Sequence, residues 1–91
     1  MTSDPRARFD AIRDEISAND AAIVGLVNER LRLVTALWEL KRVLALDTVD
    51  PDRERRLRQH LAAANAGPLS PDGLDALVTS LLELTKRELG A

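Results

Sequence analysis

Two long cationic side chains occupy places in an apolar stripe where leucine or isoleucine would be expected. The stripe has three- and four-residue spacing, and its apolar members are Phe9, Ile12, Ile16, Ile23, Leu26, Leu33, Leu37 and Leu44. Arg30 and Lys41 fill two places in the same series, which runs 26, 30, 33, 37, 41 and 44. This spacing is typical of one face of an α-helix. A buried charge is costly unless it is paired, so the pattern predicts either a neutralising group elsewhere in the fold or an anionic ligand.

Arg30 and Lys41 are eleven residues apart, which is about three helical turns, so they share a helix face. One interpretation is a cationic pocket for an anion. The alternative is that both side chains extend to water from the edge of a helix interface. Arg13, which follows the stripe residue Ile12, is a third candidate cation, and its alternative is an ordinary surface arginine.

Glu54 is the candidate acceptor, because it lies on the same predicted helix face as Leu57 and Leu61. An inward carboxylate could accept a hydrogen bond from a ligand hydroxyl or neutralise Lys41. The alternative is that Glu54 only interacts favourably with the helix start, a role that Asp50 can already fill.

Thr85 lies on the apolar face of the last predicted helix, which carries Leu74, Leu77, Val78, Leu81, Leu82 and Leu89. A buried threonine usually donates to the carbonyl one turn back, and we expect that bond here. The basic run Arg53, Arg55, Arg56 and Arg58 is typical of a solvated face with short-range ion pairs to its neighbouring acids.

Composition excludes several classes of site. The chain has no cysteine and one histidine, His60, so a thiolate or histidine-rich metal site is excluded. A net charge of −2 and only two aromatic residues, Phe9 and Trp38, argue against a nucleic-acid partner. No segment is long and apolar enough to span a membrane, and the N-terminus lacks the apolar core of a signal peptide. We therefore expect a soluble, cytoplasmic, all-helical protein with no cofactor and no metal.

The 91 residues predict one domain over 1–91, built from helices at about 6–45, 51–64 and 71–89. Asp50 and Ser70 are predicted N-caps, each followed by a proline at the first helical position. A first helix of this length would extend roughly 60 Å, too long for the remaining residues of so small a domain to cover. We therefore predict a homodimer in which the long helices of two chains pack together.

With these positions in order, the chain resembles the all-helical chorismate mutase family. The resemblance lies in Arg13 within AIRDEISANDAAI, Arg30 within LVNERLRLV, Lys41 within ALWELKR, and the segment VDPDRERRL from Val49. It covers nearly the whole chain from about Phe9. It implies an entwined dimer of three-helix subunits and the rearrangement of chorismate to prephenate, for phenylalanine and tyrosine biosynthesis, with no cofactor.

The resemblance also implies a role for each matching residue. Arg30 would grip one substrate carboxylate, and Arg13 would reach the other in the partner subunit's site. Lys41 would hydrogen-bond the ether oxygen and a carboxylate. Glu54, with the backbone at Asp50, would hold the ring hydroxyl. Two further substrate-binding residues are implied: Arg53, close to the hydroxyl, and Thr85, where many members have a serine.

The C-terminal segment GPLSPDGLDALVTSLLELTKRELGA looks like the short actinobacterial intracellular subclass. Leu89 stands where many family members have a glutamine that meets the ether oxygen. Members of this subclass are weak catalysts alone, and they are activated by a 3-deoxy-arabino-heptulosonate 7-phosphate synthase, which the resemblance implies as a partner.

Three other functions stay open on the same scaffold. Two are related enzymes, an isochorismate pyruvate-lyase and a 4-amino-4-deoxychorismate mutase. The third is a helical regulatory module without catalytic activity.

Overall fold

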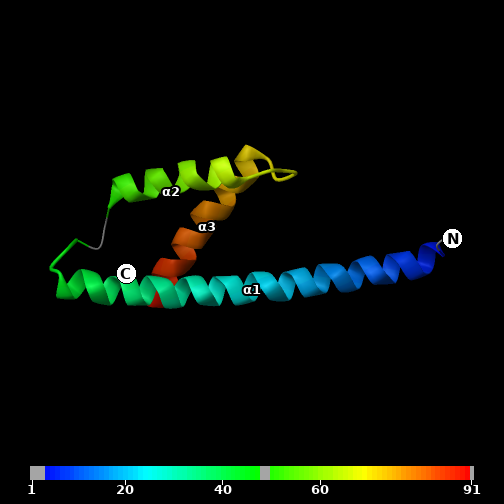
Figure 1. Ribbon diagram of the computed structural model, residues 1–91, viewed down its shortest axis with the longest axis horizontal. Coiled ribbons are helices and arrows are strands. Elements are labelled where there is room, and N and C mark those ends of the chain that lie inside the picture. Colours follow the sequence, from blue (N-terminus) through cyan, green and yellow to red (C-terminus); the bar gives the residue numbers. More distant parts are fainter. Residues whose placement is uncertain (1–3, 48–49, 91) are drawn as a thin grey trace. The chain divides into compact units, whose positions relative to one another are not determined.

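The computed structural model describes residues 4–47 and 50–90, and every regular element within them is an α-helix. The helices are α1 (Pro5–Val43), α2 (Pro51–Ala64) and α3 (Pro71–Leu89), as Figure 1 shows. The prediction of an all-α chain with three helices is confirmed. The bounds of α2 and α3 equal the predicted ones, whereas α1 ends at Val43 rather than at residue 45.

The early end of α1 has a local cause in the backbone at Ala45, which has a φ of 57°. The Ala45 N–H donates to the Arg42 carbonyl at 3.2 Å, and the Leu46 N–H donates to the Lys41 carbonyl at 2.8 Å. Together these two bonds form a Schellman cap, in which a left-handed residue closes the last helical turn. Leu44, assigned above to the helical stripe, therefore lies beyond the helix.

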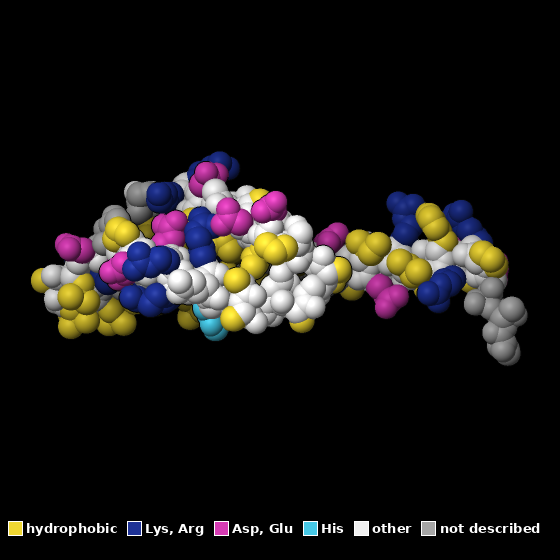
Figure 2. All heavy atoms as spheres, turned by 90° about the horizontal axis from the view of Figure 1, so that it is seen from above, with side chains coloured by type: hydrophobic (Ala, Val, Ile, Leu, Met, Phe, Trp, Pro, Cys, Tyr) yellow, Lys and Arg dark blue, Asp and Glu magenta, His cyan; other side chains and the backbone are white. Residues whose placement is uncertain are grey.

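The chain divides into two compact units, of which the first is Met1–Val34. Its helix starts at an N-cap formed by Asp4, whose Oδ1 accepts from the Arg6 N–H at 3.1 Å. No residue of α1 is buried. The large apolar side chains exposed in this unit are Phe9, Ile12, Ile16, Ile23, Val24, Leu26 and Leu33. Figure 2 shows apolar side chains lying openly along this segment between arginines.

The second unit, Thr35–Ala91, contains the end of α1 together with α2 and α3. Its most buried residues both lie on α3: Val78 is 1% exposed and Thr85 is 7% exposed. Half-buried leucines surround them at Leu57, Leu61, Leu74, Leu81, Leu82, Leu84 and Leu89. α2 and α3 contact each other. Leu77, predicted on the apolar face of α3, is 49% exposed, so the face that packs within this unit is narrower than the predicted stripe.

The link between α2 and α3 is held by side chains that bond the nearby backbone. Asn65 donates to the Leu69 carbonyl at 2.9 Å, and its Oδ1 accepts from the Gly67 N–H at 3.0 Å. Ser70 caps α3 by accepting from the Gly73 N–H at 3.0 Å. A Cβ at Gly73 would lie 2.8 Å from Leu69 Cδ1, so a larger residue there would require the exposed Leu69 side chain to move. The link therefore fixes where α3 starts relative to α2.

Among the described residues, none of the helices combines the length and the apolar character that crossing a membrane requires.

Candidate active site

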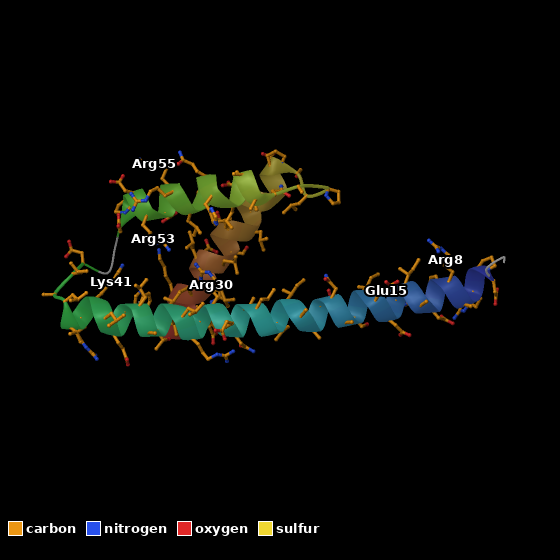
Figure 3. All side chains as sticks on the ribbon, in the orientation of Figure 1. Arg8, Glu15, Arg30, Lys41, Arg53 and Arg55 are labelled. Atoms are coloured by element: carbon orange, nitrogen blue, oxygen red, sulfur yellow. The ribbon has the colours of Figure 1, made fainter. Side chains whose placement is uncertain are left out.

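The first turn of α2 brings together three of the residues predicted from the sequence. Asp50 is the N-cap, as predicted, and its Oδ1 accepts from the Arg53 N–H at 3.1 Å. The Glu54 N–H donates to the Asp50 carbonyl at 3.3 Å. Asp50 therefore has a structural role as the N-cap of α2, and this role needs no ligand. Figure 3 shows Arg53 and Arg55 on opposite sides of α2, so the basic run is divided between two faces.

Glu54 is not held by the helix start alone, because its carboxylate is paired with Arg58 one turn further on. Arg58 Nη2 lies 3.5 Å from Glu54 Oε1 and donates to Thr79 Oγ1 at 3.1 Å. Its Nη1 forms an ion pair and a hydrogen bond with the Asp75 carboxylate. One guanidinium thus joins the predicted ligand-binding carboxylate on α2 to two residues of α3.

Arg58 is the residue of this cluster that the sequence reasoning missed, since it was assigned to a solvated face with short-range pairs. That description fits Arg55, which pairs with Asp52 at 2.6 Å within the same helix. Arg58 differs because Asp75 and Thr79 lie 17 and 21 residues away in sequence. The spacing of four to Glu54 was visible, but nothing in the local pattern pointed to α3.

Thr85 is buried on α3, and its Oγ1 donates to the Leu81 carbonyl at 2.7 Å. This is the intrahelical bond expected from the sequence, so that expectation is confirmed. A hydroxyl oxygen that donates one hydrogen bond can still accept others. Thr85 therefore has a defined structural role, and its orientation is fixed by α3.

Lys41 lies in the last turn of α1, within the second unit, and its side chain is half-buried. Its carbonyl accepts the capping bond from the Leu46 N–H at 2.8 Å. The Schellman cap therefore fixes the backbone from which the ammonium group projects. A cation in this position also interacts favourably with the negative end of the helix dipole.

Arg30, in the first unit, is half-buried, whereas the leucines one turn before and after it are not. Leu26 is 70% exposed and Leu33 is 62% exposed. This reverses the usual order, in which leucine is buried and arginine extends to water. Arg30 and Lys41 both lie within α1, whose other half-buried residues are Val27, Leu31, Val34 and Trp38.

Arg13 lies in the first unit beside the ring of Phe9. Its guanidinium carbon is 5.3 Å from the ring centroid, and that of Arg6 is 5.1 Å away. Both distances are typical of a cation–π contact. The Arg13 side chain therefore packs against the ring of Phe9 on the surface of α1 and remains exposed.

A shallow hollow in the second unit is formed by residues of α1 together with the last residue of α3. It encloses about 220 Å³ and is lined by Thr35, Trp38, Glu39, Arg42 and Leu89. Trp38 lies three residues before Lys41 and shares its side of the helix, whereas Arg42 is turned about 100° away. Leu89 and Trp38 thus line the same hollow, and each lies one helical turn from a predicted site residue: Trp38 from Lys41, and Leu89 from Thr85.

The predicted residues offer cations, one carboxylate acceptor and one buried hydroxyl; Arg13 and Arg30 lie in the first unit and the others in the second. Within residues 4–47 and 50–90, no group of three or more potential metal ligands is gathered in one place. Such a set can grip carboxylates through forked or single cationic donors and can bind a hydroxyl through Glu54. It suits a small organic dianion.

Comparison with known proteins supports this interpretation. The sequence profile of the family described as chorismate mutase type II matches residues 12–88. The fold is similar to the solved structure of a chorismate mutase from Thermus thermophilus, with a TM-score of 0.80 and 31% sequence identity. That match covers 86% of this chain and 98% of the other chain. A search of curated proteins found no match.

Proposed function

The chain belongs to the type II chorismate mutase family, and from that premise we propose which of its residues perform the isomerisation. Chorismate is rearranged to prephenate by a concerted [3,3] shift, in which one ether C–O bond breaks and one C–C bond forms. No proton, nucleophile or cofactor takes part. The work left to the protein is to hold a flexible dianion in a folded conformation and to stabilise the charge that develops as the ether bond breaks.

Arg30 and Lys41 are the residues we assign to the centre of this task. Arg30 grips one carboxylate through its planar fork, and Lys41 places an ammonium group at the ether oxygen. The supporting observation is that both cations are half-buried while Leu26 and Leu33, beside Arg30 in the stripe, remain largely exposed. A site that binds a dianion gives a reason for cations to take inward places.

The remaining residues complete the proposed site. Glu54 accepts a hydrogen bond from the ring hydroxyl, which the backbone at Asp50 helps to hold, and Arg53 lies one residue before Glu54. Thr85 contributes its hydroxyl from α3. Arg13 serves the partner subunit's site, which requires a second copy of the chain.

A homodimer is therefore part of the proposal. Its support is the row of exposed apolar side chains on α1, which one chain leaves uncovered. Contiguous exposed apolar surface of this kind usually marks an interface. A second long helix carrying the same stripe would cover it by symmetry.

We propose a 3-deoxy-arabino-heptulosonate 7-phosphate synthase as a further partner. We also propose that the protein is cytoplasmic. Both come from the resemblance to the short intracellular subclass. The apolar residues at the end of α1 and just beyond it, Leu40, Val43 and Leu46, are exposed in the second unit and would offer such a partner a contact surface. Measuring chorismate turnover with and without added synthase tests this proposal, and an unchanged rate would count against it.

The site assignment is tested with Arg30→Ala and Lys41→Ala, which we expect to lower kcat/KM by at least about 100-fold each, since fixed charges act where charge develops. Arg30→Lys should recover little, because the fork is lost. Matched controls are Arg32→Ala, which breaks only an exposed pair with Glu29, and Arg42→Ala on another face of α1.

Prephenate formation from chorismate is the readout, and isochorismate and 4-amino-4-deoxychorismate are assayed in parallel. Circular dichroism and sedimentation verify that each variant stays a helical dimer. Rates in both alanine variants equal to those of their controls would refute the assignment.

A further inference from the structure

We propose that Arg58 is a positioning residue for the chorismate site: it fixes the Glu54 carboxylate by tying it to α3. This inference rests on the proposed role of Glu54 as acceptor for the ring hydroxyl. It adds a residue that touches no substrate and acts through another side chain. It also gives α3 a part in binding the hydroxyl end of the substrate, beside its own Thr85.

The Arg58 guanidinium divides its donors between the two helices. Nη2 is shared between Glu54 Oε1 at 3.5 Å and the Thr79 hydroxyl at 3.1 Å. Nη1 is directed at Asp75, where it meets the carboxylate and lies 3.4 Å from the backbone carbonyl. A planar guanidinium with partners at both ends cannot rotate without losing one of them. The position of Nη2, and with it the position of Glu54 Oε1, is therefore set by α3.

Arg58 also differs from an ordinary ion-pairing arginine on the same helix. Arg55 and Asp52 form an exposed i,i+3 ion pair, and pairs of this kind contribute little. The Arg58 side chain is only 30% exposed, and its bond to Thr79 is partly buried. The Arg58 guanidinium is therefore better shielded from water than that of Arg55, while the Glu54 and Asp75 side chains are 52% and 69% exposed. The restraint on Glu54 comes from the fixed position of this guanidinium.

Glu54 keeps its acceptor capacity in this arrangement. An ionised carboxylate has about four acceptor sites on its two oxygens. The pair with Arg58 engages Oε1, so a ligand hydroxyl can bind the same group without displacing the guanidinium. Arg58 also offsets the repulsion between Glu54 and a doubly negative substrate, because it places a positive charge next to that carboxylate.

The test compares Arg58→Ala with Arg55→Ala, a matched control three residues away in α2 whose ion pair stays within that helix. We expect Arg58→Ala to raise KM for chorismate about tenfold with kcat changed less than threefold, because the hydroxyl is bound in ground and transition states alike. Arg55→Ala should leave both constants at wild-type values. Arg58→Lys should recover part of the loss, since it restores the charge but not the fork.

Two further variants separate positioning from folding. Asp75→Asn weakens the anchor on α3 without touching Glu54, and should raise KM by about two- to fivefold. Glu54→Gln should raise KM strongly, and adding Arg58→Ala to it should cause little further loss, because the two residues act as one unit. Thermal unfolding and sedimentation of each variant show whether the dimer persists.

The outcomes are distinct. Suppose that Glu54→Gln impairs the enzyme while Arg58→Ala has the same constants as Arg55→Ala. The inference about Arg58 is then overturned and the proposed site stands. If Arg58→Ala fails to fold, Asp75→Asn takes its place in this comparison. If Glu54→Gln has wild-type constants, the assignment of Glu54 fails and the inference fails with it. Additive losses in the double variant would show that Arg58 does not act through Glu54, which also overturns the inference.

Discussion

The first unit and the α2–α3 pair use the same helical secondary structure but stabilise it in different ways. In the first unit, α1 has no buried residue, and its apolar stripe is exposed. In the α2–α3 pair, Val78 and Thr85 are buried, and Arg58 joins the two helices. The pair holds its own geometry, whereas the stripe of α1 requires another surface.

The two halves of the proposed site are therefore oriented in different ways. Glu54 and Thr85 are oriented by contacts inside one chain, since Arg58 and the Leu81 carbonyl hold them. Arg13 is instead held by Phe9, a neighbour on the same exposed helix. The carboxylate and the hydroxyl are thus prepared by the fold of one chain, while the proposed role of Arg13 depends on assembly.

The largest expected effect comes from a charge placed on the exposed stripe. We predict that Leu26→Asp separates the proposed dimer and removes most mutase activity. Burying a leucine contributes about 1.5–3 kcal/mol, and two copies meet in a symmetric dimer, so Kd should rise by roughly 100-fold or more. Sedimentation across a concentration series, with activity measured on the same samples, gives the result.

Asn28→Asp is the matched control for this variant, because it places the same side chain two residues away on the opposite face of α1. It should leave Kd and activity near wild type. A dimer unaffected by Leu26→Asp would mean that the stripe of the first unit is not the interface, and the comparison would lose its basis.

A smaller effect is expected inside the α2–α3 pair. We predict that Val78→Ala destabilises the protein by about 2 kcal/mol, because it deletes two methyl groups at a site that is fully enclosed. Urea unfolding at a fixed protein concentration measures this change. Val43→Ala makes the same deletion at a residue that is 76% exposed in one chain, and should cost less than about 0.5 kcal/mol.

The losses at the two valines distinguish burial within one chain from burial on assembly. An equal loss at Val43 would show that the end of α1 is covered in the assembled protein. A negligible loss at Val78 would contradict the view that the α2–α3 pair is stabilised from within.

The sequence predicts features that depend on neighbouring residues, and it misses those that depend on contacts between distant segments. The starts of α2 and α3 were predicted correctly because a capping side chain followed by proline is a local signal, found at Asp50 and Ser70. The end of α1 was placed too late because its left-handed residue is Ala45, and neither glycine nor asparagine marks the turn. An alanine in the left-handed conformation cannot be recognised from the sequence, because alanine is also common inside helices.

The candidate site shows the same limit. The intrahelical bond of Thr85 was expected because it needs only the preceding turn. The exposure of Leu77 and the contacts of Arg58 depend on how α3 packs against α2, and helical periodicity carries no such information. The roles of Arg13, Arg30 and Lys41 stay predictions, since they come from stripe spacing and from family resemblance.

The smallest effect tests whether the α2–α3 pair is secured by its local signals. We predict that Ser70→Ala lowers stability by about 1 kcal/mol, because the Gly73 N–H loses the Oγ that accepts from it at 3.0 Å. Ser80→Ala is the control in the same helix, at an exposed interior position where alanine is the better helix former, so it should be neutral or slightly stabilising. Urea unfolding of both variants at one protein concentration separates the cap from general helix propensity. Equal stabilities would mean that packing of α3, rather than its cap, determines where the helix begins, and the α2–α3 pair would then depend on tertiary contacts as fully as the stripe of α1 does.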